Sequence, residues 1–460
     1  MVRVFSHWLS PRKAAFFVAE ETALVLAMLA GSSIAPLAHP WVAVETGLAP
    51  AFLRAAIAST AFAGALYFGD LYDLKAAARD RADGRRLLRA LGVATITLAA
   101  AYVVLPLFLP LGLLSRRSLV FAVAGGALAV IAVRAAFPAV VGAPIRVLFL
   151  GNGPRARSLA RDLEAEADAL FEVVGFAEAG NRVESAPLSF VGPLPHVARR
   201  LKAQVVVVAV EDRRAGIPVD QLLECRTRGL QVMSDVAFAE ATLKRIPLDL
   251  VRPSALIFEE GFATSTARRA AKRMGDVAVA GLMLVALAPV MALVALAIVL
   301  SDGRPVLYSQ ERTGQDGRRY LMWKFRSMRR DAERMGAQWT SDADPRVLRV
   351  GRVLRKARLD ELPQLWNVLR GDMSMVGPRP ERPVFLQELK VRYPLFALRE
   401  LAKPGLTGWA QLKYGYGSSI EEMGKKLEFD LYYIKNTSFF LDAVCLFHTA
   451  KVVLTGREAR

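Results

Sequence analysis

The sequence predicts a membrane protein built of three parts: a helical N-terminal membrane bundle, an α/β module, and a mostly α-helical C-terminal domain with a re-entrant membrane helix. The 460-residue chain is 53% hydrophobic, and its longest apolar runs gather before residue 145 and again at 277–300. Short strand-like runs alternate with helix-like stretches between these two regions. We therefore divide the chain into 1–145, 146–267 and 268–460.

The first part contains four apolar segments, each close to the roughly 20 residues that a membrane-spanning helix needs. They are residues 14–37, 51–68, 87–111 and 118–141. The loop at 39–50 has no Lys or Arg, whereas 73–89 contains one lysine and five arginines. The positive-inside rule then places the N-terminus and this second loop in the cytoplasm. Arg116 and Arg117 in the third loop argue against this orientation, but the six basic residues of the second loop outweigh them. After four crossings, the rest of the chain lies in the cytoplasm.

The second part alternates in character. Strand-like runs at 146–150, 173–177 and 205–210 are separated by helix-like stretches, including 155–169 and 218–227. This alternation predicts a parallel, Rossmann-like α/β module.

A glycine turn follows the first of these strands. Gly151 and Gly153 precede a helix, and such a turn can hold a phosphate on backbone amides, so both glycines are candidate cofactor-binding residues. A short glycine pattern alone is weak evidence for this, and it is more typical of a scaffold or regulatory module that has kept the turn.

The apolar run at 277–300 is long enough to cross a bilayer, but its flanks argue against a crossing. Four basic residues lie at 268–273, and four more lie between 304 and 319, so both ends look cytoplasmic. Pro289 removes a backbone donor and would break the helix near its middle. We therefore predict a re-entrant helix. The alternative is a plain spanning helix that tolerates a proline.

The candidate chemistry centres on Asp360 and Glu361. They follow Arg346, Arg349, Arg352 and Arg355, whose spacing of three predicts one basic side of a helix. Such a stripe is often a solvated face or a lipid-headgroup contact, but it also suits phosphate oxygens. Asp360 has a second interpretation as the N-cap of a helix in which Pro363 lies in the first turn.

Further cations flank the acidic pair in the sequence. Lys324 and Arg326 lie in a basic-aromatic segment, and Arg379 lies between Pro378 and Pro380, which restrict its backbone. Phosphoryl transfer needs a nucleophile, cations for the phosphate oxygens and usually Mg²⁺. Asp360 can be the nucleophile or a metal ligand, while Lys324, Arg326, Arg355, Pro378 and Arg379 are candidate substrate-binding residues.

Composition narrows the partners. The net charge of +18 favours anionic lipid headgroups or phosphorylated ligands, and no nucleic-acid-binding motif accompanies it. The two distant cysteines imply neither a disulfide framework nor a cysteine zinc site, and the four scattered histidines argue against a histidine metal cage. A metal in this protein should therefore be a hard ion bound by oxygen.

Five ordered motifs together resemble the bacterial sugar transferase family, in its large membrane form. The motifs occupy 324–328, 359–365, 377–381, 403–411 and 430–436, with the last leading to 452–456. The family transfers a sugar 1-phosphate from a UDP-sugar to polyprenyl (undecaprenyl) phosphate, releases UMP, and initiates exopolysaccharide assembly. One departure is that the family's helix break is often Ser-Pro, whereas this chain has Ala288 before Pro289.

The resemblance implies specific roles. Asp360 would attack the sugar-bearing phosphorus and form an aspartyl phosphosugar, Glu361 would assist by activating the lipid phosphate or shaping the metal site, and Mg²⁺ would bind near Asp360. Arg355 and Arg379 match positions that contact phosphate or nucleotide. The resemblance also implies a multi-pass protein of the bacterial inner membrane, a catalytic domain facing the cytoplasm, and a homodimer.

Two other functions are compatible with parts of the same sequence. A membrane-bound nucleotide-sugar dehydratase would normally need a Tyr-x-x-x-Lys pair, and 146–267 contains no tyrosine. A non-enzymatic scaffold or sensor would bind lipid and nucleotide without turnover. The sequence does not reveal which sugar is transferred.

Overall fold

The computed structural model describes most of the chain, and we treat only the described residues. These are 2–4, 7–9, 11–37, 48–72, 84–104, 116–141, 144–166, 171–177, 182–184, 189–191, 193–211, 217–251, 261–262, 265–330, 332, 344–414 and 419–455. The chain forms two compact units, which divide between Ser234 and Asp235, except that the segment Arg3–Trp8 belongs to the second unit. Two short paired strands, β1 (Val2–Val4) and β2 (His7–Leu9), lie at the start of the chain.

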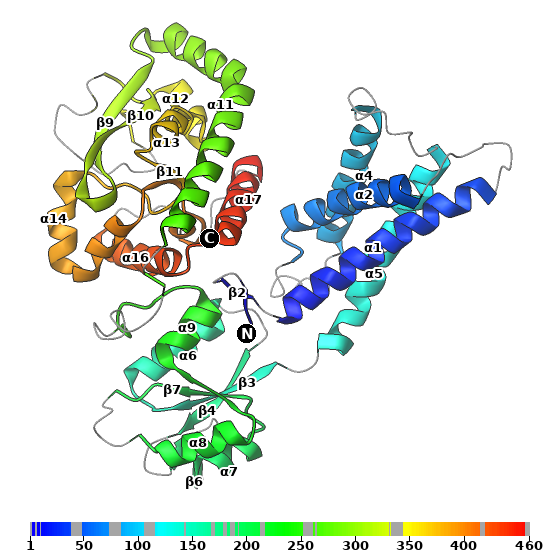
Figure 1. The fold of residues 1–460 in the computed structure, drawn as a ribbon, viewed down its shortest axis with the longest axis vertical. Coiled ribbons are helices and arrows are strands. Elements are labelled where there is room, and N and C mark those ends of the chain that lie inside the picture. Colours follow the sequence, from blue (N-terminus) through cyan, green and yellow to red (C-terminus); the bar gives the residue numbers. More distant parts are fainter. Residues whose placement is uncertain are drawn as a thin grey trace. The chain divides into compact units, whose positions relative to one another are not determined.

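Four helices form the first part of the N-terminal unit. They are α1 (Pro11–Leu37), α2 (Leu48–Phe68), α4 (Arg85–Val104) and α5 (Arg116–Val141). Helix α1 packs along α5 and against α2, and α2 packs against α4 (Figure 1). Leu24, Phe62 and Val130 are fully buried between them. The four predicted apolar segments are thus confirmed as helices, apart from 105–111, which lie outside the described residues.

The second part of this unit is an α/β module. Its elements are β3 (Ile145–Leu150), α6 (Pro154–Glu166), β4 (Phe171–Ala177), β5 (Arg182–Glu184), β6 (Ser189–Val191), α7 (Leu194–Arg200), β7 (Val205–Val208), α8 (Val219–Thr227) and β8 (Gln231–Ser234). The strands lie in the order β6-β5-β4-β3-β7-β8, and the four from β4 to β8 are parallel. Helix α6 covers one face of the sheet and α7 and α8 the other (Figure 1). The parallel sheet predicted for this region is confirmed.

The C-terminal unit is mostly helical, as predicted, with a β-hairpin and a two-stranded parallel pair. Its helices are α9 (Asp235–Leu243), α11 (Thr266–Asp302), α12 (Arg349–Lys356), α13 (Gln364–Arg370), α14 (Pro383–Arg392), α15 (Trp409–Lys413), α16 (Ile420–Lys435) and α17 (Phe439–Thr455). The 3₁₀ turns are η4 (Gln315–Gly317), η5 (Leu359–Glu361) and η6 (Pro394–Leu401). Strands β9 (Leu307–Thr313) and β10 (Arg319–Phe325) form the hairpin, and β11 (Ser374–Val376) pairs with β12 (Gly405–Thr407).

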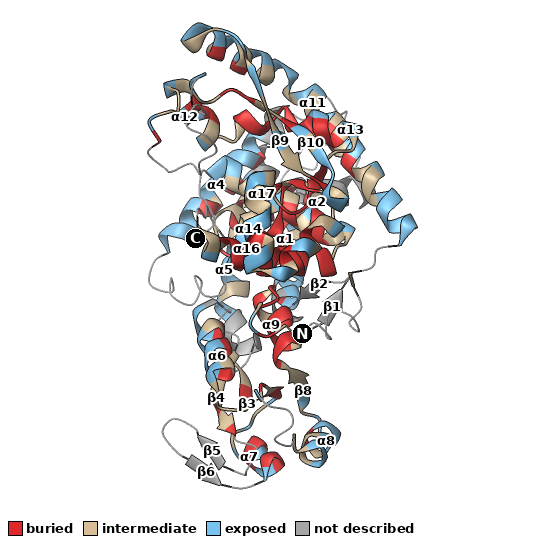
Figure 2. Cartoon of the chain, turned by 90° about the vertical axis from the view of Figure 1, so that its left-hand side faces the viewer, coloured by how far each residue is buried: buried red, intermediate tan, exposed pale blue. Residues whose placement is uncertain are grey.

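Helix α11 is the one helix in the described part of the chain that is long and apolar enough to cross a membrane, by length and composition. It begins after Ser265, whose side chain accepts a hydrogen bond from the amide of Arg268. It continues as a single helix through Pro289. In Figure 1, the second half of α11 bends away from the direction of its first half. Figure 2 shows mostly exposed or half-buried residues along the helix. Leu282, Val285 and Leu300 are among the strongly exposed apolar side chains. Membrane association is therefore indicated.

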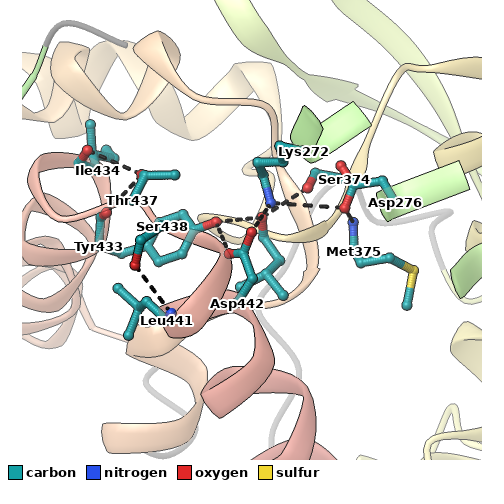
Figure 3. Close-up of polar contacts among 11 residues, drawn as sticks. Lys272, Asp276, Ser374, Met375, Tyr433, Ile434, Thr437, Ser438, Leu441 and Asp442 are labelled. Carbon is teal, nitrogen blue, oxygen red and sulfur yellow. Dashed lines mark hydrogen bonds and ion pairs between the residues drawn. The ribbon is translucent and has the colours of Figure 1, made fainter. Parts of the chain in front are cut away.

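The base of α11 is fixed to the rest of its unit by polar contacts. Lys272 lies between Asp276 and Asp442 in Figure 3, 2.7 Å from the Asp442 carboxylate. Asp276 accepts a hydrogen bond from the amide of Met375 in β11. Arg273 donates to the last carbonyls of α13, including that of Leu369 at 2.7 Å. The apolar helix is thus joined directly to α13, which follows the acidic pair, and to β11, which precedes the loop of Arg379.

Candidate active site

The acidic pair lies in a short 3₁₀ turn between two helices. Helix α12 ends at Lys356, and Arg358 then adopts a left-handed conformation with φ of 57°. This turn directs Asp360 and Glu361 inward, so that they are only 7% and 8% exposed. Helix α13 starts at Gln364, with Pro363 at its N-cap. The interpretation of Asp360 as an N-cap is therefore wrong, because the proline takes that position.

Three cations surround the Glu361 carboxylate. Its Oε1 atom lies 3.2 Å from an Arg379 nitrogen and 3.4 Å from Lys324 Nζ, and its Oε2 atom lies 3.6 Å from Arg358. Burial alone would raise the pKa of Glu361, but the charges of Arg379, Lys324 and Arg358 outweigh it and hold the pKa at about 2. Glu361 therefore stays ionised and keeps these cations together.

Asp360 differs from its neighbour. Its carboxylate makes no hydrogen bond or ion pair with any residue that the structure describes. Burial, and then the charge of Glu361, raise the pKa of Asp360 above its ordinary value, while Lys324, Arg355 and Arg379 act in the opposite direction. A desolvated carboxylate without a partner, next to a group of cations, is suited to attack a phosphorus that those cations hold.

Arg379 lies in a loop that is fixed by backbone packing. Gly377, Gly405 and Gly408 approach one another so closely that a Cβ on Gly405 or Gly408 would overlap the backbone of Gly377. Gly377 donates to the carbonyl of Thr407 at 2.9 Å, which continues the β11–β12 pairing. The motifs at 377–381 and 403–411 therefore form one structural unit, and their glycines permit its close contact.

Side chains hold the same loop from the other side. Arg399 donates to the carbonyl of Arg379 at 2.8 Å and pairs with Asp430 at 2.9 Å. Arg312 donates to the carbonyl of Pro380 at 2.9 Å. Pro378 is buried, and its carbonyl accepts from the amide of Gly405. The predicted binding residues Pro378 and Arg379 are thus held in one rigid loop.

Lys324 is positioned by a buried asparagine. Asn367 in α13 is fully buried, accepts from the amide of Trp323 at 3.0 Å and donates to the carbonyl of Leu321 at 2.7 Å. These bonds fix strand β10 against α13, which follows the acidic pair.

Sequence reasoning missed Asn367, Arg358 and Arg399, and it included Asp430 in the motif at 430–436 without assigning it a role. The only local signal was a polar residue among the buried apolar positions of α13.

Two of the predicted basic residues lie elsewhere. Arg326 donates to the carbonyls of Asp302 and Gly303 at the end of α11, at 3.0 and 2.7 Å, and contacts no member of the acidic pair. Arg346 precedes α12 and pairs with Asp344 at 2.8 Å. The predicted basic helical stripe is therefore wrong for Arg346, because helix α12 begins only at Arg349. Substrate binding by Arg326 stays a prediction without a supporting contact.

The position of Arg355 depends on the close contact between helix α12 and the backbone of Ser327. Gly351 in α12 lies against the carbonyl of Ser327, and a Cβ at this position would overlap that oxygen. Arg355 lies one turn later, close enough to lower the pKa of Asp360. The motif at 324–328 thus places α12 as well as Lys324.

The glycine turn of the α/β module is filled by protein atoms. Gly151 has φ of +114°, and a Cβ there would lie 2.6 Å from the carbonyl of Ala209. A Cβ on Gly153 would lie 2.7 Å from the carboxylate of Glu211, which is also 3.5 Å from the amide of Arg155. A carboxylate at this helix start competes with a phosphate, so cofactor binding at Gly151 and Gly153 stays a prediction that Glu211 opposes.

A magnesium ion fits the acidic pair in one particular manner. In the described part of the chain no three Asp, Glu, His or Cys side chains gather into a protein-only metal cage. Magnesium commonly takes only one or two carboxylates and completes its shell with water and substrate phosphates. Asp360 supplies such a carboxylate, whereas Glu361 is already engaged by cations.

The C-terminal part of the chain is similar in sequence to known proteins. Residues 267–456 match the family described as bacterial sugar transferase. A UDP-N-acetylgalactosamine-undecaprenyl-phosphate N-acetylgalactosaminephosphotransferase of Aeromonas hydrophila is 43% identical over 189 residues, which are 41% of this chain and 45% of that protein. An undecaprenyl-phosphate glucose phosphotransferase of Komagataeibacter xylinus is 34% identical over 325 residues, 68% of this chain and 60% of that protein.

Some relatives are matched over most of their length. A UDP-glucose:undecaprenyl-phosphate glucose-1-phosphate transferase of Caulobacter vibrioides is 40% identical over 190 residues, 41% of this chain and 71% of that protein. The chain spans about half the length of the larger relatives, with 45% and 60% covered in the two proteins above. The matched region contains the whole acidic site, and on this match the chain belongs to the bacterial sugar transferase family.

Proposed function

We propose that this protein transfers a sugar 1-phosphate from a UDP-sugar to undecaprenyl phosphate, releases UMP, and so begins the assembly of an exopolysaccharide. The observation that supports this most strongly is the contrast within the acidic pair. Glu361 holds Lys324, Arg358 and Arg379, and Asp360 beside it has no hydrogen-bond or ion-pair partner among the described residues. The same unit carries the long apolar helix α11, which suits a lipid acceptor.

The reaction would proceed in two displacements. An oxygen of the Asp360 carboxylate attacks the sugar-bearing phosphorus, the phosphoanhydride bond breaks, and UMP leaves with the bonding electron pair. An oxygen of polyprenyl phosphate then attacks the same phosphorus of the aspartyl phosphosugar, and the Asp360 carboxylate is released unchanged. Each step replaces one P–O bond by another, as in other covalent phosphoryl transfers.

The surrounding residues would bind and orient. Arg379, Lys324 and Arg355 are placed to contact the phosphate oxygens of the donor. Since the pKa of Glu361 is held at about 2, it is a weak base. Glu361 therefore contributes by fixing the cations and shaping the site. Mg²⁺ bound by Asp360 and the substrate phosphates would neutralise charge on the diphosphate.

The sugar and the polysaccharide are left open. The relatives named above carry N-acetylgalactosamine or glucose in their names, and a few pocket contacts can decide between such sugars. A panel of UDP-sugars offered to the purified protein tests this directly.

Membrane placement is part of the proposal. We interpret α11 as a re-entrant helix, because both flanks are basic and Pro289 lies inside it. The N-terminal helices would cross the inner membrane several times and leave the catalytic domain facing the cytoplasm. We propose a division of the sequence into 1–145, 146–267 and 268–460, with a Rossmann-like module in the middle part, although residues 235–250 of that part pack within the C-terminal unit. The family match begins at 267 and the compact unit at Asp235.

We also propose that the protein acts as a homodimer, as expected for large family members. The molar mass of the detergent-solubilised protein, corrected for bound detergent, tests this. A monomeric mass at working concentration would contradict it.

Substitution of Asp360 tests the reaction. Purified Asp360→Asn should release no UMP from any UDP-sugar in the presence of polyprenyl phosphate, because the amide cannot form the phosphosugar linkage. Asp316→Asn makes the same chemical change at an exposed turn residue and should leave UMP release unchanged. Turnover retained by Asp360→Asn would remove the nucleophile from the proposal.

A further inference from the structure

Residues 235–250, which we call the strap, are buried in the C-terminal unit although they precede the region that matches the family. The strap consists of α9 and the turns after it, and the match begins only at residue 267. Phe238, Ala239 and Ile246 are at most 1% exposed. Such burial is not typical of a passive linker between domains, which is usually exposed and polar.

The strap binds α16 through buried charged groups. Glu240, which is 4% exposed, accepts from Lys435 Nζ at 2.7 Å and from the side-chain amide of Asn436 at 2.9 Å. Arg245, which is 3% exposed, donates to Glu428 at 2.7 Å. Buried pairs of this kind are costly to disturb, because removing one partner leaves the other charge in an apolar setting.

Two backbone contacts extend the same interface. The carbonyl of Lys244 accepts from the indole N–H of Trp409 at 2.9 Å, and the amide of Ile246 donates to the carbonyl of Glu428 at 3.0 Å. Trp409 is 2% exposed and lies in the motif at 403–411. Residues of two family motifs, Trp409 and the pair Lys435 and Asn436, thus have polar partners in the strap.

The opposite side of α16 holds the loop that carries Arg379. Asp430 pairs with Arg399, which donates to the carbonyl of Arg379. The hydroxyl of Tyr433 lies 2.9 Å from the carbonyl of Val376, immediately before that loop, and Figure 3 shows it beside Asp442.

Helix geometry separates the two sets of contacts. Glu428 and Lys435 are two turns apart and share a face, whereas Asp430 follows Glu428 by two residues, or about 200° around the helix. A capping box formed by Ser419 and Glu422 fixes the start of α16. Helix α16 therefore lies between the strap on one side and the loop that carries Arg379, which we call the arginine loop, on the other.

We propose that the strap is an integral part of the catalytic unit and that Glu240 and Arg245 are positioning residues, which act through α16 to hold Arg379 against the donor diphosphate. Neither residue contacts the acidic pair in the described structure, so the effect is indirect. The kinetic part of this inference rests on the proposed function, whereas its structural part does not.

The test uses the full-length protein in detergent with Glu240→Gln. We expect the KM for the UDP-sugar to rise about tenfold, because the free energy of one hydrogen bond to a charged group corresponds to roughly this factor in binding. The kcat at saturating donor should change little. Hydrogen exchange at the amides of Gly377 and Arg379 should become faster, without any substrate present. Glu388→Gln makes the same change at an exposed position of α14 and should alter neither quantity.

The double variant Glu240→Met with Lys435→Met removes both charges and should recover the wild-type exchange and most of the KM, since paired apolar replacements are often tolerated. If Glu240→Gln does not fold, Arg245→Lys, which keeps the charge, is judged by the same two readouts. The inference is overturned if the variant loses active protein while the KM and the exchange of Gly377 and Arg379 stay unchanged. Absence of turnover in the wild-type protein would instead contradict the proposed function, and the exchange result would still stand.

Discussion

At the scale of single residues, the site separates two adjacent carboxylates by their surroundings. Glu361 is enclosed by Lys324, Arg358 and Arg379, which keep it ionised, whereas Asp360 is buried and has no ion pair or hydrogen bond to any part of the chain that the structure describes. One acid thus organises the cations, and the other is left available for bond formation. This division follows from the left-handed turn at Arg358, which directs both side chains inward.

Asp430 gives the arginine loop a dependence on pH. Burial raises the pKa of Asp430 to about 6, with Glu381 acting in the same direction and Arg399 and Lys426 opposing it. Below this pH the carboxyl is protonated and holds Arg399 less strongly. The KM for the UDP-sugar should therefore rise as the pH falls through about 6, whereas Asp430→Asn should show a raised KM that is independent of pH. Steady-state kinetics between about pH 5 and pH 8 check this, and identical profiles for the two proteins would contradict it.

The sign for stability is opposite. Between the ordinary aspartate pKa of 3.8 and about 6, the folded protein retains a proton on Asp430 that the unfolded chain releases. The contribution of this group to the free energy of unfolding therefore decreases as the pH rises through that range. The free energy of unfolding of Asp430→Asn should lack this contribution. The difference between the wild-type and Asp430→Asn free energies of unfolding should therefore change with pH over this range.

At the scale of elements, the site depends on close approaches of backbone to backbone. The parallel pair of β11 and β12 carries Arg379 at one end, and α12 rests on the segment at 324–328 through Gly351. These approaches explain why glycines recur in the motifs. They also place residues from distant parts of the sequence within one site.

Gly351→Ala should disturb α12. Its methyl group would overlap the carbonyl of Ser327, so we expect a loss of roughly 1–3 kcal/mol in the free energy of unfolding, together with slower UMP release as Arg355 is displaced. Gly281→Ala in α11 adds the same methyl group where, beyond the adjacent backbone of its own helix, no atom of the described residues lies within 4 Å, and it should have little effect. Denaturant unfolding and UMP release of both variants in detergent make the comparison. Equal behaviour of the two variants would show that α12 can move without cost.

The topology of α11 is testable with introduced cysteines. Arg457→Cys should react with an impermeant thiol reagent only from the cytoplasmic side, because a re-entrant helix returns the chain to the face it came from. Glu45→Cys, in the first loop, should react from the outside and serves as the control for access. The two native cysteines, Cys225 and Cys445, are buried. Labelling of Arg457→Cys from outside intact cells would replace the re-entrant helix by a spanning one.

At the scale of the whole molecule, local patterns predicted the elements, and distant contacts decided the site. Periodicity located the N-terminal helices and the parallel sheet, since these depend on local hydrophobic pattern. The sequence also pointed to Asp360, Glu361, Lys324 and Arg379 by residue type and motif. It could not reveal that Arg326 binds the end of α11 or that Arg399 holds Arg379, because these are contacts between residues far apart in the chain.

The packing of the strap also could not be predicted from local sequence. Nothing local marks residues 235–250 as part of the C-terminal unit, since their partners lie more than 150 residues away in the sequence. The division predicted at residue 267 follows composition and the family motifs, whereas the compact unit follows burial.

The central claim is that a carboxylate of the enzyme carries the phosphosugar between donor and lipid. The most direct measurement incubates the purified wild-type protein with a UDP-sugar labelled in the sugar, without polyprenyl phosphate, and detects label bound to the protein. The account predicts label on Asp360, released on addition of the lipid, and none on Asp360→Asn. An unlabelled wild-type protein, under conditions in which complete mixtures form the lipid product, would contradict it.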